Sequence, residues 1–173
     1  DVRFRSYCGP DIRAWSAPVE DLSDWRDEGP IFTYPIDKQW DVMYAPDLVE
    51  VTKKDDTKEY YLYPHSRGRD REAMVAKGNR PDGPFTPINM TADGMRTVPG
   101  STMGFDPSVY IEYITDPKDP DYGIGFRAYG FWGFQRSQAG QLDQNTMYSI
   151  RPGTQAIGYF IPASSRYGVI RDP

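Results

Sequence analysis

The sequence is poor in the residues from which several kinds of functional site are built. Its 173 residues include one cysteine, Cys8, and one histidine, His65. A single cysteine excludes an intrachain disulfide framework, and one Cys with one His cannot form a His/Cys zinc cluster within this chain. A Ser-His-Asp arrangement would rest on His65 alone, and the G-x-S-x-G pattern of many serine hydrolases is missing. We therefore expect no metal site and no hydrolase site of these kinds.

Positive charge and long apolar runs are also scarce. Lys and Arg total 20 against 25 Asp and Glu, which gives a formal net charge of -5 and a pI near 4.9. Binding to a nucleic-acid backbone depends on clustered Lys and Arg, so this balance argues against a nucleic-acid partner. No segment approaches the roughly 18 apolar residues of a membrane-spanning helix, which argues against membrane insertion. The sequence leaves the cellular compartment open.

Helix signals are weak, whereas strand and turn residues are abundant. Residues 17–29, APVEDLSDWRDEG, have a helical pattern, but Pro18 and Gly29 bound them so closely that we expect about one turn. Aromatic residues make up 14% of the chain, and Gly and Pro contribute 16 each, a mixture suited to short strands and many turns. Strand patterns recur in DIRAWSAP, EYYLYPHS, EAMVAKG, PSVYIEY and FRAYGFWGF. The sequence therefore predicts an all-β fold, with a turn in NRPDG, where Pro81 presets φ and Gly83 accepts a positive φ.

Similar segments recur at a spacing that indicates blades of a β-propeller. The Gly-Pro pairs at 29–30 and 83–84 are 54 residues apart, and each follows a strand and a polar turn. Pro46 in MYAPDLVEV and Pro107 in GFDPSVYIEY are 61 residues apart, and each has an acidic neighbour and then a strand. Repeats of about 50 residues with several strands each are typical of propeller blades.

At that period the chain holds about three blades, whereas propellers close with roughly 4 to 8. We expect residues 1–173 to be part of one domain without an internal boundary. The remaining blades would come from further sequence or from another chain.

Six motifs occur in order along the chain: YCGPDIRAWSAPVEDLSDWRDEGPIF, DVMYAPDLVE, KEYYLYPHS, MVAKGNRPDGPF, GFDPSVYIEY and YGFWGFQRSQAGQLDQNTMYSIRPGT. Together they resemble glycoside hydrolase family 43 (GH43), whose members are five-bladed β-propellers acting mostly on glycans that contain arabinose or xylose. The resemblance implies a funnel-shaped site on the propeller axis, lined by residues from the starts of the innermost strands. It also implies three carboxylates: an Asp base, an Asp that orients and tunes the acid, and a Glu acid. No organic cofactor is implied.

Asp106, followed by Pro107, matches the orienting and tuning Asp of that family. The base is expected before DVRFRSY, in residues that this chain does not contain, and the acid is absent too. One alignment places Pro162 where the acid belongs, which would describe an inactive protein. In the alignment that we favour, YFIPASSRYGVIRDP is a loop upstream of the acid. Under either alignment this sequence supplies one of the three carboxylates.

Four further residues are candidates for binding a substrate. Tyr44 and Ala45 open the strand equivalent to that of Asp106, so we expect them to face the same funnel, where an aromatic ring can stack on a sugar. Phe105 and Trp132 are candidates for the same reason, although Trp132 is as well suited to packing between blades. We expect His65, in YPHS, to be a hydrogen-bonded surface or inter-blade histidine and not a catalytic residue.

Two acidic features have structural interpretations. Asp47 is expected to turn away from the axis if Ala45 faces it, because side chains alternate along a strand. Residues 116–123, DPKDPDYG, offer three carboxylates but lack the spacing and terminal Glu of an EF-hand loop, so we expect a solvated hairpin tip and not a calcium site.

The function predicted from the resemblance is inverting hydrolysis of O-glycosyl bonds, of the α-L-arabinofuranosidase or β-xylosidase type, on oligosaccharides or side chains of plant-type polysaccharides. Inverting hydrolysis needs both an acid and a base, so the 173 residues alone are expected to be inactive. Two alternatives stay open: a propeller that binds a glycan or protein without catalysis, and a fragment that assembles with another chain.

Overall fold

The structure, a computed structural model, describes residues 9–34, 36, 42–66, 68, 70–134 and 136–161. Within these ranges the chain forms ten strands, and its remaining residues are turns and irregular segments. No helix in this part of the chain is long and apolar enough to cross a membrane. The predicted all-β class is confirmed.

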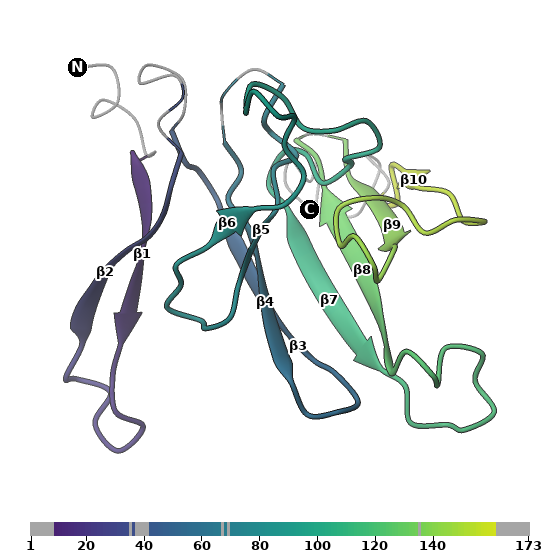
Figure 1. Cartoon of the computed structure of the whole chain (residues 1–173), viewed down its shortest axis with the longest axis horizontal. Helices are drawn as coiled ribbons and strands as arrows, with labels where there is room; N and C mark the ends of the chain where they lie inside the picture. The colour runs from purple at the N-terminus through teal and green to yellow at the C-terminus, as the bar shows by residue number, and fades with distance from the viewer. Residues whose placement is uncertain are drawn as a thin grey trace.

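Three antiparallel sheets follow one another along the chain and lie side by side (Figure 1). The first is a hairpin of β1 (Asp11–Ser16) and β2 (Arg26–Thr33). The second has four strands: β3 (Asp47–Thr52), β4 (Lys58–Tyr63), β5 (Ala76–Gly78) and β6 (Thr86–Pro87). The third also has four: β7 (Ser108–Tyr113), β8 (Phe126–Trp132), β9 (Gln138–Leu142) and β10 (Ile157–Gly158).

Within each sheet the neighbouring strands are also consecutive in the sequence. Such four-stranded meanders, packed one behind another, are the blades of a β-propeller. The chain is therefore a partial β-propeller with two four-stranded blades and a two-stranded hairpin, as the repeated segments predicted.

The middle sheet is buried on both faces, and the alternation along β4 shows how. Tyr60 and Leu62 pack toward the hairpin, together with Ile31 and Phe32 of β2. Tyr61 and Tyr63 point the other way and pack against the third sheet. Because alternate side chains of a strand face opposite sides, a strand between two layers needs a continuous apolar run, which the last four residues of KEYYLY supply.

Every other residue of β8 faces the core between the second and third sheets. Phe126, Ala128 and Trp132 are buried in it, with Leu142 of β9. Gly130 occupies the third of the four inward positions of β8, where a methyl group would overlap the sulfur of Met103. This glycine lets the buried methionine approach the sheet backbone closely.

Two local predictions have different outcomes. The turn in NRPDG is confirmed: Gly83 has a φ of +71°, and its N–H donates to the carbonyl of Arg80 at 3.1 Å. The helical turn expected within 17–29 is wrong, because this segment forms successive β-turns, one of them closed by the Asp21 N–H on the Pro18 carbonyl at 3.1 Å. The end of the segment is taken into β2, whose pairing with β1 reaches back to Arg26.

The acidic stretch 116–123 lies in the connection between β7 and β8, as expected, but it is not solvated throughout. Asp121 is 4% exposed and accepts hydrogen bonds from Arg127 Nε and from both terminal nitrogens of Arg151, all at 2.6 Å. Arg127 also contacts Asp119 at 2.5 Å. The carboxylates of Asp119 and Asp121 are therefore paired with arginines. No cluster of His, Cys, Asp or Glu suited to a metal ion occurs among the described residues.

Candidate functional site

The candidate site lies where β3 and β7, the first strands of the two complete blades, begin. These strands are neighbours in space, and both start at the upper end of the molecule in Figure 1. Asp47, the first residue of β3, accepts a hydrogen bond from the Val109 N–H of β7 at 2.6 Å. Burial raises the pKa of Asp47, although backbone hydrogen bonds from Val109 and Leu48 oppose the shift. Asp47 thus joins the two strand starts, consistent with the structural role expected from the sequence.

Asp106 lies in the turn that leads into β7. Its φ is +48°, a left-handed conformation that non-glycine residues adopt uncommonly and that Asp tolerates better than most. The preceding carbonyl, of Phe105, accepts a hydrogen bond from the Gly133 N–H at 2.6 Å, which ties the turn to the end of β8. The Asp106 side chain is 23% exposed, so it is reachable from solvent at the strand start.

His65 meets Asp106 from the neighbouring blade. His65 follows β4, and the antiparallel pairing of β4 with β3 brings the end of β4 to the start of β3. The backbone carbonyl of His65 accepts a hydrogen bond from the Tyr44 N–H at 3.3 Å. Its Nδ1 lies 3.3 Å from Asp106 Oδ1, and its side chain is 1% exposed. Burial lowers the pKa of His65 to about 4. The sequence analysis expected a hydrogen-bonded surface or inter-blade histidine. His65 does contact the neighbouring blade, but it is buried, and its contact with Asp106 was not predicted.

Aromatic rings surround the His65–Asp106 contact. The Tyr44 ring lies 5.4 Å from the imidazole, and the Phe105 ring packs edge-on against it at 4.3 Å. Phe134, which is 48% exposed, continues the row at 5.3 Å from Phe105. Tyr44 and Phe105 are therefore brought together with Asp106, and Phe134 is an additional member of the cluster, for which FWGF gave a signal only in its neighbour Trp132.

The other two predicted binding residues differ in their surroundings. Ala45 is exposed beside Tyr44 at the entry to β3. Trp132 is 4% exposed and packs in the core between the second and third sheets. Its indole therefore offers little surface to a ligand.

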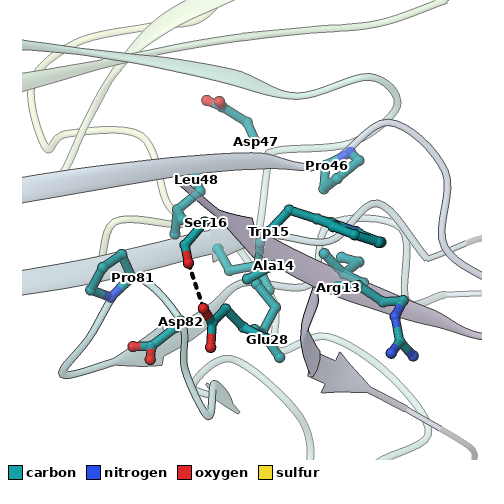
Figure 2. Close-up of a pocket in the computed structure, with 13 residues that line it drawn as sticks. Arg13, Ala14, Trp15, Ser16, Glu28, Pro46, Asp47, Leu48, Pro81 and Asp82 are labelled. Atoms are coloured by element: carbon teal, nitrogen blue, oxygen red, sulfur yellow. Dashed lines mark hydrogen bonds between the residues drawn. The ribbon is translucent and has the colours of Figure 1, made fainter. Parts of the chain in front are cut away.

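A separate cavity of about 380 Å³ lies on the other side of the start of β3, between β3 and β1 (Figure 2). Trp15, Pro46 and Leu48 line it, whereas the carboxylate of Asp47 points away from it, toward the neighbouring blade. At its polar end, Ser16 donates a hydrogen bond to Glu28 (Figure 2). This cavity is mostly apolar and does not include Asp106.

The chemistry that these residues can support follows from their types. A partly exposed carboxylate can accept hydrogen bonds from hydroxyl groups or influence a second acid placed next to it, while exposed aromatic faces suit the apolar faces of sugars. One carboxylate cannot act as both the acid and the base of inverting hydrolysis, which stand roughly 6.5 to 9.5 Å apart.

Comparison with known proteins gives one informative result. No family model matches the sequence, and no curated protein matches it. Among solved structures, the chain is similar to a GH43 β-1,3-galactosidase solved with galactodeoxynojirimycin, with a TM-score of 0.51 and 16% sequence identity. The match covers 90% of this chain and 54% of that chain, so this chain spans about half the length of that protein. The likeness agrees with the partial β-propeller fold of this chain.

Proposed function

We propose that this chain is part of a glycoside hydrolase related to GH43, in which Asp106 orients and tunes the general acid. The observation that carries the proposal is the meeting of Asp106, Tyr44 and Phe105 where two neighbouring first strands begin. This is the place at which a funnel on a propeller axis would open. The GH43-like fold supports the same assignment.

The substrates proposed first are arabinofuranosides and xylosides, in oligosaccharides or in side chains of plant-type polysaccharides. The solved structure to which the fold is similar is a β-1,3-galactosidase, which makes β-galactosides a second candidate class. The reaction proposed is inverting hydrolysis without a cofactor.

The acid and the base are proposed to come from outside these 173 residues. Residues 1–173 would form part of one domain, and the remaining blades would be supplied by further sequence or by another chain. Intact mass and oligomeric state of the natural protein distinguish these two sources.

The test is turnover of chromogenic α-L-arabinofuranoside, β-D-xyloside and β-D-galactoside by the protein in its full natural form. The proposal expects hydrolysis of at least one of them, with the anomer of the first-formed sugar inverted in proton NMR spectra. Binding of oligosaccharides in calorimetry without turnover would instead favour a non-catalytic glycan-binding propeller. Neither turnover nor glycan binding by a folded sample would overturn both assignments.

A further inference from the structure

His65 is a buried titratable group that the predicted chemistry does not use. Its side chain is 1% exposed, and neither ring nitrogen makes an aligned hydrogen bond with any other described residue. Burying a polar group without a hydrogen-bond partner is unfavourable, so a buried histidine at this position calls for an explanation. The Asp106 carboxylate lies beside it, with Oδ1 3.3 Å from Nδ1.

Backbone conformation points to the same contact. Six described non-glycine residues have a positive φ, and two of them are His65, at +46°, and Asp106, at +48°. Conformations of this kind persist where the surrounding structure holds them in place, and they concentrate at functional sites. Here the two residues with left-handed backbone conformations come from different blades, and their side chains contact one another.

The rings around the imidazole restrict how it can move. Phe105, the residue before Asp106, contacts it edge-on, and Tyr44 packs beside it. With both of these sides covered, the ring presents its Nδ1 edge to Asp106. Because burial disfavours the charged form, the imidazole is neutral near pH 7, and a neutral ring can donate only from the nitrogen that carries its proton.

We infer that His65 is a positioning residue for Asp106: its neutral imidazole carries the proton on Nδ1 and holds Oδ1 of the carboxylate. In the proposed function, this contact fixes the orientation of the carboxylate that acts on the general acid. The part of this inference that concerns catalysis rests on the proposed function, whereas the pairing and the tautomer do not.

The chain offers a direct test, because His65 is its one histidine. A sample without a histidine tag gives a single imidazole in long-range proton–nitrogen NMR spectra, from which the protonated nitrogen is read. At pH 7 we expect a neutral ring protonated on Nδ1. Asp106→Ala removes the acceptor and should change the tautomer population, whereas Asp56→Ala, at another Asp with positive φ, should not.

Two results would overturn the pairing: a wild-type ring protonated on Nε2, or a tautomer that is the same in wild type and Asp106→Ala. If Asp106→Ala does not fold, the wild-type spectrum decides alone.

A second measurement separates positioning from simple packing in the full-length enzyme. Asn and Leu have similar shapes, but the Asn side-chain amide can still donate from near the position of Nδ1. We expect His65→Leu to lower kcat at least 10-fold more than His65→Asn, with KM changed little in both. Equal losses in the two variants would leave only a packing role. Absence of turnover in the wild type would count against the proposed function and leave the NMR result standing.

Discussion

The carboxylate of Asp47 accepts a hydrogen bond from the backbone N–H of Val109 at 2.6 Å, and so joins the first strands of two neighbouring blades. Asp47→Ala should destabilise the protein by about 1 to 3 kcal/mol, because it leaves the Val109 N–H without this acceptor. Asp47→Asn retains an acceptor oxygen and should cost less. Urea unfolding of both variants measures the difference, and equal stabilities of Ala variant and wild type would contradict this role.

The second prediction concerns catalysis by the full-length protein. Asp106→Asn should lower kcat by about 100-fold or more, within the range typical of groups that support proton transfer. A negative charge raises the pKa of a neighbouring acid, so its removal should shift the alkaline limb of the pH–rate profile to lower pH. Asp56→Asn, in the exposed turn between β3 and β4, is the matched control. Unchanged kcat in Asp106→Asn would remove it from the catalytic machinery.

Stability should depend on pH through His65. Its pKa is lowered by burial to about 4, below the unfolded value near 6.5, so the unfolded chain binds more protons between these values. The free energy of unfolding should therefore fall as the pH drops from about 6.5 to 4, by up to about 3 kcal/mol.

Urea unfolding at several pH values measures this dependence, and in His65→Asn the slope in that window should be reduced. Hydrogen bonds from Arg151 and Arg127 lower the pKa of the Asp121 carboxyl to about 2. Its contribution to stability is therefore lost mostly below this pH window. A slope that is unchanged in His65→Asn would show that other groups are responsible.

Asp121 should be important for the connection between β7 and β8. Asp121→Asn removes the charge that pairs with Arg127 and Arg151 and leaves two partly buried guanidinium groups less compensated. Breaking fully buried pairs costs roughly 3 to 5 kcal/mol, and because these arginines keep some exposure we expect about 2 to 3 kcal/mol. Asp116→Asn, in the same connection but exposed, should be nearly neutral in thermal unfolding. Similar melting temperatures for the two variants would contradict the prediction.

Gly130 is predicted to be intolerant of any side chain. A methyl group there would overlap the Met103 sulfur and lie 3.2 Å from Leu142 Cδ2, so Gly130→Ala should cost about 1 to 3 kcal/mol. Gly123→Ala has open space and is the control. Combining Gly130→Ala with Met103→Ala should cost less than the sum of the two single variants, whereas strict additivity would show that the methyl group does not meet Met103.

Much of the fold could be predicted from local chemistry. The turn around Gly83 and the strands bounded by Gly and Pro follow from backbone preferences that act over a few residues. The place of Asp106 at a strand start was also readable, from its Asp-Pro sequence and the strand pattern that follows.

What sequence reasoning missed depends on contacts between blades. His65 and Asp106 are far apart in the sequence, and the signal that connects them is the hairpin: the end of β4 lies beside the start of β3, which in turn lies beside β7. The burial of Asp121 was missed for a similar reason, since Arg151 reaches it from beyond β9. In both cases a partner that is distant in the sequence determines the surroundings of the residue.

The arrangement of each blade as a run of consecutive strands has a consequence for how the chain acquires its structure. Every backbone hydrogen bond within a sheet joins strands that are also neighbours in the sequence, so a blade can be completed as soon as its own residues have left the ribosome. Loop closure for such contacts is short and therefore fast. His65 and Asp106 can meet only when the sheet of β7–β10 docks on the sheet of β3–β6. The site is therefore assembled after the two sheets that carry it.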